Sequence, residues 1–317
     1  MGGGGTDGGL QALRRRELMQ PVAAPIAAIT EAARQRHGDA VAAVLFYGSC
    51  LRLGSDEDKI VDLYVLVDGY AAAYGAGLRA ALNWALPPNV FYLETPFEGR
   101  VVRAKYAVVS LADFAKGASG GWFHPYLWAR FAQPCRLSYC RDDAVCGTMA
   151  SALAGSVKKS AGEGLALVGD RFTVRDLWVA LFRQTYRTEL RAEPPERAGE
   201  IYDANAAHYE TVSTIALADL GAVAAEGPAE GERCWQRTRR PGNAGGKWWL
   251  RRLQGKLLSV ARLVKAAFTF QDGAHYLLWK IERHSGVSIV LTPWQRRHPI
   301  LASTVLFWRL YRKGAFR

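Results

Sequence analysis

The fold of this chain is constrained most strongly by two apolar segments on either side of a glycine turn. The second of these segments contains one carboxylate. Residues 44–46 are apolar and lie in a predicted buried strand, Val41–Tyr47, which ends at Gly48 and Ser49. A second β-rich run, Ile60–Val67, carries one carboxylate, Asp62, inside it. An aspartate within an apolar strand is unfavourable unless it is paired or binds a cation. The sequence therefore predicts two neighbouring strands with an aspartate that has a specific partner.

The glycine–serine turn indicates what that partner could be. A turn at Gly48 and Ser49 lets the backbone approach a ligand closely, and its N–H groups can hold phosphate oxygens. A strand carboxylate beside the turn, Asp62, can bind a magnesium ion that bridges those phosphates. The same residues also fit a structural hairpin whose aspartate faces solvent at a sheet edge. Nucleotidyl transfer and a purely structural turn both stay open on this stretch alone.

An ordered series of motifs resembles the polymerase-β-type nucleotidyltransferase superfamily. Within it, the series is similar to the mitochondrial-type phosphatidate cytidylyltransferase family, the CDP-diacylglycerol synthases that are also named for translocator assembly and maintenance. The motifs are Tyr47-Gly48-Ser49, Ile60-Val61-Asp62-Leu63, Val67-Asp68, Asn83-Trp84, Lys105 to Ser110, Leu111-Ala112-Asp113-Phe114, Tyr126 to Pro134 and Tyr186 to Arg191. The likeness covers roughly residues 40–220 and keeps the order of the motifs.

The resemblance implies a fold, a reaction and a set of site residues. The fold is α+β, a nucleotidyltransferase-like mixed sheet with helices followed by a mainly helical, winged-helix-like domain. The reaction is the transfer of CMP from CTP to phosphatidic acid, with Mg²⁺ as cofactor. The implied residues are Asp62 and Lys105 for catalysis, Tyr47, Gly48 and Ser49 for the nucleotide, and Tyr186, Glu189 and Arg191 for the cleft between domains.

Some of these assignments have structural alternatives. The superfamily usually has two aspartates one residue apart, whereas Ile60 stands at the earlier position here. Glu94, at the end of a predicted strand, is a candidate second magnesium ligand or a solvent-facing strand end. Lys105 could meet a phosphate or lie on the surface with its apolar stem buried. Tyr186 and Glu189 share a helix face and could equally form a structural cluster.

The secondary-structure pattern divides the chain into five parts. Residues 1–9 are expected to be a flexible leader without the apolar core of a secretory signal. Residues 10–141 are expected to hold two helices interrupted by prolines, the sheet strands, a helix over 70–86 and a helix over 122–131. Residues 142–225 predict three helices, the second beginning with a capping box at Thr173 and Asp176. The expected remaining parts are a linker, 226–246, and a basic amphipathic region, 247–317.

Charge is concentrated in the last quarter of the chain. The net charge is +12, and residues 231–317 hold 18 Lys and Arg against 3 Asp and Glu. Apolar residues recur at 249, 253, 257, 260, 264 and 268, the spacing of an amphipathic helix. Tryptophan, cationic residues and an apolar stripe suit a helix that lies in a membrane interface. The expected membrane-binding residues are Trp249, Arg251, Arg252, Leu253, Arg262 and Lys265, and the alternative is a helix packed on the domain.

The remaining composition limits the class of protein. No run of about 18 apolar residues occurs, so no transmembrane helix is expected. The five cysteines lack metal-ligand spacing and predict free thiols in a reducing compartment. We therefore expect a peripheral protein on an anionic membrane, facing the bacterial cytoplasm or the mitochondrial matrix, with CTP and phosphatidic acid as ligands and no nucleic-acid partner. Two alternatives remain: a nucleotidyltransferase for another acceptor, and a degenerate, non-catalytic assembly factor.

Overall fold

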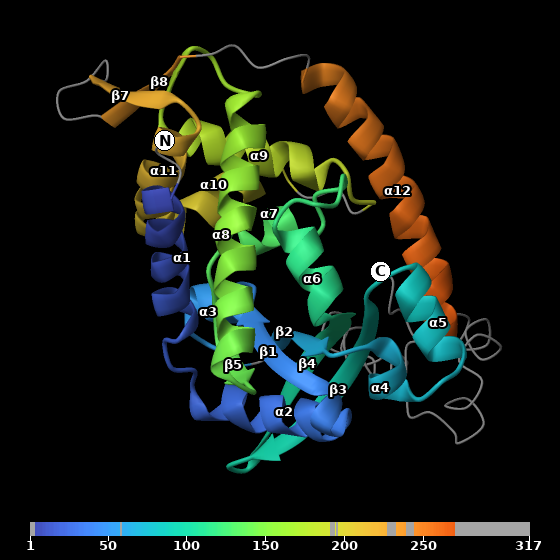
Figure 1. Ribbon diagram of the computed structural model, residues 1–317. Helices are drawn as coiled ribbons and strands as arrows, with labels where there is room; N and C mark the ends of the chain where they lie inside the picture. Colours follow the sequence, from blue (N-terminus) through green and yellow to red (C-terminus); the bar gives the residue numbers. More distant parts are fainter. Residues whose placement is uncertain are drawn as a thin grey trace, which may run out of the picture.

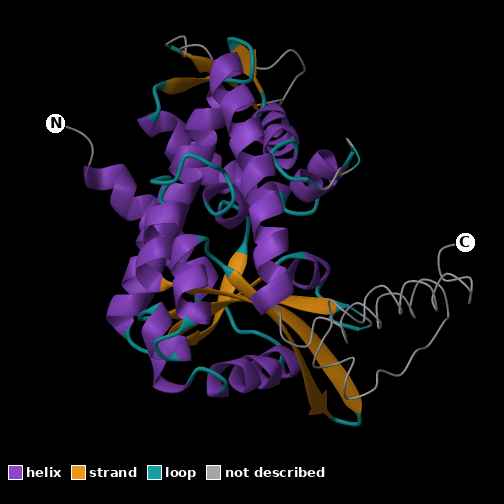
Figure 2. Cartoon of the chain, turned by 90° about the vertical axis from the view of Figure 1, so that its right-hand side faces the viewer, coloured by secondary structure: helices purple, strands orange, loops and turns teal. Residues whose placement is uncertain are grey.

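A computed structural model describes residues 4–57, 59–190, 194, 196–226, 233–238 and 244–269. These residues form an α+β structure, with a five-stranded mixed sheet towards one end and a helical part with a three-stranded sheet at the other (Figure 1). The long helix α12 (Ala244–Thr269) runs down the outside from the small sheet to the level of the large one (Figures 1 and 2). Among the described helices, none combines the length and the apolar character needed to cross a bilayer.

The large sheet places its most apolar strand inside. Its strands are β1 (Val41–Tyr47), β2 (Ile60–Val67), β3 (Asn89–Phe97), β4 (Arg100–Ser110) and β5 (Cys135–Cys140), in the order β3-β4-β2-β1-β5. Strands β2 and β4 run parallel, and the other neighbours are antiparallel. Every residue of β1 is buried, because the strand has a neighbour on each side and helices on both faces. Its continuous apolar sequence follows from this position.

Helices cover the two faces of the large sheet and fix where Asp62 points. On β2, Val65 belongs to the core formed with α2 (Ala24–Gln35), whereas Tyr64 belongs to the core formed with α8 (Asp143–Leu165). Alternate residues of a strand face the same side of the sheet. Asp62 therefore faces the α8 side, two residues before the part of β2 that the α8 core covers.

The remaining helices of this part are short apart from the first. They are α1 (Gly4–Leu18), α3 (Ser49–Leu53), α4 (Tyr70–Tyr74), α5 (Leu78–Ala85), α6 (Leu111–Ala118) and α7 (Trp128–Phe131). The helix expected over 70–86 is divided into α4 and α5 at Gly75, which has φ of 74°. Of the helix expected over 122–131, only α7 is α-helical. The helix at Gly4 corrects the expected flexible leader, since α1 packs along α8 and buries Leu10.

The helical part follows the predicted pattern and adds a small sheet. It contains α9 (Val174–Tyr186), α10 (Arg197–Asp203) and α11 (Ala206–Asp219), with strands β6 (Arg171–Phe172), β7 (Ala222–Glu226) and β8 (Arg233–Arg237) in the order β6-β8-β7. The capping box at Thr173 and Asp176 is confirmed. The segment expected as a linker, 226–246, instead supplies β8 and the start of α12. Trp235 of β8 packs against the helical core, and this contact explains why the segment is structured rather than an exposed linker.

The cysteines only partly follow the prediction. Cys50, Cys135 and Cys234 are free and buried. Cys140 and Cys146 form a disulfide bond, with their Cα atoms 6.3 Å apart. The prediction of free thiols is therefore wrong for this pair, because the end of β5 turns directly into α8 and brings the two residues together.

Candidate functional site

The turn after β1 requires a glycine. Gly48 lies between β1 and α3 with φ of 87°, a conformation that side chains disfavour. A Cβ atom at this position would lie 2.7 Å from Oδ2 of Asp62. The glycine thus lets the backbone pass directly over the carboxylate. The sequence pattern predicted a carboxylate beside the turn, whereas the predicted close approach was that of a ligand and not of Asp62.

Asp62 and Lys105 meet at the exposed end of the sheet. Strands β2 and β4 are parallel, and their register places Asp62 beside Lys105. The Lys105 Nζ lies 3.2 Å from Oδ1 of Asp62, and both side chains remain part-exposed. The buried-strand aspartate therefore has a cationic partner, and the strand lysine points into the site rather than to the outer surface.

A cavity of about 390 Å³ opens above this pair. Its walls come from the β1–α3 turn, the segment before α7, the end of α9, α10 and α12. Among the lining residues, five carry a positive charge and two are acidic: Arg52, Lys105, Arg130, Arg197 and Arg262 against Asp62 and Glu189. His124 also lines the cavity, and burial together with the charge of Arg262 lowers its pKa to about 4, so it is neutral at pH 7. An excess of cations in a hollow of this kind favours an anionic ligand.

Arg130 occupies a central position in the cavity wall. Its Nη1 donates to the Tyr47 hydroxyl at 3.2 Å, and its guanidinium lies 4.8 Å from the ring centroid of Tyr126. Glu189 lies 3.7 Å from its Nη2. Burial raises the pKa of Tyr47 to about 12, so the phenol stays protonated at neutral pH. Tyr47 therefore lines the pocket as expected, with Arg130 as its partner.

A second pair of cations lies at the α3 and α10 wall. Arg52 of α3 and Arg197 of α10 both line the cavity. Burial and the charge of Arg197 lower the pKa of Arg52. Arg197 also donates to Glu200 on its own helix. Tyr186, predicted to line a cleft, lies at the same cavity.

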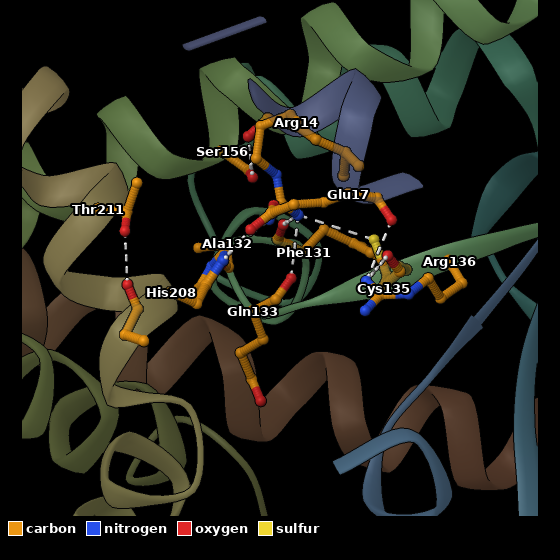
Figure 3. A network of polar contacts seen from close by, with 12 residues as sticks. Arg14, Glu17, Phe131, Ala132, Gln133, Cys135, Arg136, Ser156, His208 and Thr211 are labelled. Atoms are coloured by element: carbon orange, nitrogen blue, oxygen red, sulfur yellow. Dashed lines mark hydrogen bonds and ion pairs between the residues drawn. The ribbon is translucent and has the colours of Figure 1, made fainter. Parts of the chain in front are cut away.

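A buried polar network supports the wall from behind (Figure 3). Arg14 of α1 is fully buried and donates to the carbonyl oxygens of Phe131 and Gln133, at 3.2 and 3.1 Å. Glu17 and His208 form a 2.7 Å contact beside it. Burial opposes ionisation of Glu17, but the hydrogen bond with His208 and the charge of Arg14 lower its pKa overall. The network ties α1 and α11 to the end of α7, which carries Arg130.

Helix α12 supplies the last wall and corrects two membrane assignments. Arg262 lines the cavity and donates from Nε to the Pro87 carbonyl oxygen at 3.3 Å. Lys265 is buried and donates to the carbonyl oxygens of Leu86 and Pro88. Burial, aided by the charge of Arg262, lowers the pKa of Lys265 to about 8. Neither side chain is available to a membrane surface in this arrangement.

Arg251 is the third assignment that the structure corrects. Its side chain is 1% exposed and forms two hydrogen bonds to Glu163 of α8, at 2.6 and 2.7 Å. Its Nε donates to the Phe123 carbonyl oxygen at 2.8 Å, and its guanidinium lies 4.8 Å from the ring centroid of Trp248. Hydrogen bonds and these ion pairs lower the pKa of Glu163 to about 2 despite its burial. Arg251 thus anchors α12 to the core.

The opposite face of α12 is apolar and exposed. Its residues are Trp249, Leu253, Leu257, Val260 and Val264, between 46% and 63% exposed. Trp249 and Leu253 therefore lie on an outward surface, as expected for membrane contact. Arg252 lies part-buried beside them, with a hydrogen bond to the Trp248 carbonyl oxygen.

One predicted site residue, Glu94, is not at the cavity. Glu94 pairs with Arg103, which lies opposite Ile60 rather than Asp62, so strand β4 and two register positions separate the two carboxylates. Its carboxylate instead accepts from Tyr92 and Arg103. Glu94 is therefore not placed to share an ion with Asp62. Arg191 lies outside the described residues, whereas Glu189 does line the cavity.

The donor set limits how a metal could bind. In the described part of the chain, no three His, Cys, Asp or Glu side chains gather into a metal-binding group. Magnesium in phosphoryl-transfer sites is commonly held by one or two carboxylates together with substrate phosphates. Asp62, beside the Gly48 turn, fits the role of the protein carboxylate in such a site. The phosphates of a bound triphosphate would supply the other ligands of the ion.

Sequence reasoning missed several cavity residues. Arg52 and Arg197 were not predicted, and Arg262 was assigned to a membrane surface. These three residues lie on separate elements that only the tertiary structure brings together, so no local spacing identifies them. Tyr126, Arg130 and Thr188 stood within quoted motifs without an assigned role, and the motifs were the one available signal. Comparison of the sequence with models of protein families and with curated proteins finds no match.

Proposed function

We propose that this chain is a phosphatidate cytidylyltransferase, which transfers CMP from CTP to phosphatidic acid and releases pyrophosphate. The observation that carries the proposal is the cavity itself, where Asp62 and Lys105 meet under the Gly48 turn with four further cations around them. Nucleotidyl transfer depends mainly on positioning phosphates and offsetting their charge. The residues at this cavity are suited to both tasks.

The reaction assigns a task to each group. An oxygen of the acceptor phosphate attacks the α-phosphorus of CTP, the bond from that phosphorus to the bridging oxygen breaks, and pyrophosphate leaves. Lys105 and the two arginines of the α3 and α10 wall, Arg52 and Arg197, offset the negative charge on the triphosphate. The Gly48 turn lets the nucleotide approach the backbone. Magnesium, when bound with CTP at Asp62, would supply further charge neutralisation.

The topology of both parts agrees with the proposal. A mixed sheet that ends in a glycine turn and a strand aspartate is the arrangement of polymerase-β-type nucleotidyltransferases. In the second part, the elements follow the order α8, β6, α9, α10, α11, β7, β8, and the sheet order is β6-β8-β7. Apart from the additional helix α10, this order resembles that of a winged helix and supports the expected winged-helix-like domain. Both features support the motif resemblance, which supplies the identity of the acceptor.

The outer face of α12 supports a membrane-bound acceptor. Phosphatidic acid with long acyl chains is insoluble in water, so an enzyme that uses it in a membrane must contact the bilayer. The exposed stripe from Trp249 to Val264 offers apolar side chains, one of them a tryptophan, of the kind that enter a lipid interface. We propose that this stripe contacts the bilayer, while the inner face of the same helix closes the cavity.

A second candidate is a non-catalytic assembly factor. The observation that favours it is that Asp62, the one carboxylate that the described residues place at the Gly48 turn, is already paired with Lys105. A degenerate site of this kind could still bind a nucleotide without turning it over. Binding without product would therefore separate this candidate from the first.

The test is a product assay over several acceptors. The full chain is incubated with CTP and magnesium, and with phosphatidate vesicles, an oligonucleotide or a set of small alcohols. CDP-diacylglycerol with pyrophosphate supports the proposal, and transfer only to another acceptor contradicts it. CTP binding by calorimetry without any product would favour the assembly factor.

A further inference from the structure

We propose that Arg262 and Arg130, which share the ring of Tyr126, bind the acceptor phosphate, and that the site selects a phosphomonoester lipid. This inference rests on the proposed function and names where its second substrate lies. It follows from the two separate groups of cations in the cavity and from the two faces of α12.

The cavity cations belong to different walls. Arg52 and Arg197 lie on α3 and α10, and Arg262 lies on α12. Figure 1 shows α3 left of the centre of the molecule and α12 along its right side, and both helices contribute residues to the same cavity. A nucleotide that reaches the Gly48 turn comes next to Arg52, because α3 begins directly after that glycine. The α12 wall is then left for the other reactant.

Arg262 is held in a position suited to a phosphate. Its guanidinium carbon lies 4.2 Å from the ring centroid of Tyr126, and that of Arg130 lies 4.8 Å from the same centroid. In the described part of the chain Arg262 forms no ion pair, and its hydrogen bond to Pro87 uses only Nε. Two guanidinium groups beside one ring repel each other unless an anion lies between them, and a guanidinium matches two phosphate oxygens at once.

The outer face of α12 indicates the class of acceptor. Val260 and Val264, two residues on either side of Arg262, are exposed on the apolar stripe. One helix therefore presents an anion-binding group to the cavity and apolar side chains to the outside. A lipid would match both faces of the helix, because its charged headgroup could lie in the cavity and its apolar chains along the stripe.

The charge of the subsite distinguishes two kinds of lipid phosphate. A phosphomonoester carries close to two negative charges at pH 7, whereas a phosphodiester carries one. Arg130 and Arg262 together supply two positive charges, offset only in part by Glu189 at 3.7 Å from Arg130. The terminal oxygens of a monoester dianion are also more basic than those of a diester, and are therefore the better nucleophiles towards the α-phosphorus of the nucleotide. The subsite therefore favours a monoester over a diester.

The test uses Arg262→Gln with a water-soluble acceptor, so that membrane attachment does not affect the measured rates. Steady-state rates are measured with dihexanoyl phosphatidate and CTP varied separately. Loss of charge-assisted hydrogen bonds to the acceptor should raise its KM about ten- to a hundredfold. The KM for CTP should change less than about twofold, and Arg262→Lys should recover part of the loss because it keeps the charge. Arg252→Gln, on the same helix but outside the cavity, is the matched control.

A binding measurement tests the subsite without turnover. Calorimetry with dihexanoyl phosphatidate should show binding to the wild-type chain, weaker binding to Arg262→Gln, and weaker wild-type binding of dihexanoyl phosphatidylglycerol. If the wild-type chain makes no CDP-lipid but this pattern holds, the proposed function fails and the subsite stands. A folded Arg262→Gln protein with unchanged acceptor KM and unchanged phosphatidate binding would overturn the inference, as would a rise confined to the KM for CTP.

Discussion

Replacing Arg251 with methionine should test whether α12 is part of the folded core. The change keeps much of the side-chain volume and removes both hydrogen bonds to Glu163 and the one to Phe123. Glu163 then remains in a site where it is 7% exposed, with Lys247 and Lys159 as its remaining partners. Removing one partner of a buried ion pair costs about 3–5 kcal/mol.

The pKa of Glu163 gives an independent magnitude. A shift from 4.5 to about 2 corresponds to about 3 kcal/mol of stabilisation from its partners taken together. The folded-state pKa is lowered, so this contribution is present above pH 4.5 and is lost as the pH falls towards 2. The stability difference between wild type and Arg251→Met should therefore be largest near pH 7 and shrink below about pH 4.

The assay is chemical denaturation followed by tryptophan fluorescence and circular dichroism. We expect Arg251→Met to lose about 3 kcal/mol of unfolding free energy at pH 7. Arg252→Met, one residue further along α12, should lose less than about 0.5 kcal/mol, since Arg252 has only a hydrogen bond within its own helix. A loss below about 1 kcal/mol for Arg251→Met, or an equal loss for both variants, would refute the anchoring role.

Three further substitutions test other parts of the structure. Gly48→Val should weaken CTP binding measured by calorimetry at least about tenfold, because its side chain would meet Asp62; unchanged affinity would make the turn purely structural. Gly255→Leu should lower the unfolding free energy by about 1–3 kcal/mol, since a Cβ there lies 2.9 Å from that of Thr188; wild-type stability would contradict this close packing. Trp249→Glu with Leu253→Glu should leave stability unchanged and abolish sedimentation with phosphatidate vesicles, and continued sedimentation would place the membrane contact elsewhere.

The central strands were predictable because their sequences leave few alternatives. The bounds of β1 and β2 match the predicted runs, since an unbroken apolar sequence of this length fits a strand buried on both faces. The position of a carboxylate beside the Gly48 turn followed from the same stretch. The pairing of Asp62 with Lys105 needed the register of β2 with β4, which sequence alone does not provide.

The exposed face of α12 could be predicted from the sequence, but the burial of its cationic residues could not. Its apolar stripe was visible at a spacing of three and four residues, and the described members of the stripe, Trp249 to Val264, are indeed exposed on one face. The cationic residues between them were assigned to a membrane, because Arg and Lys are usually exposed. Arg251 and Lys265 are buried instead, because Glu163 and the carbonyl oxygens of Leu86 and Pro88 come from distant parts of the chain.

The most direct measurement of the central claim is the rate of CDP-diacylglycerol formation by the wild-type chain and by Asp62→Asn, with CTP, magnesium and dihexanoyl phosphatidate. The substitution removes a charge without changing the volume, and the pair with Lys105 is part-exposed, so the fold should persist with a loss of about 1 kcal/mol or less. We expect product from the wild type and no detectable turnover from a folded Asp62→Asn protein. Equal rates for the two proteins, or no CDP-diacylglycerol from the wild type, would contradict the assignment of this cavity as a cytidylyltransferase site.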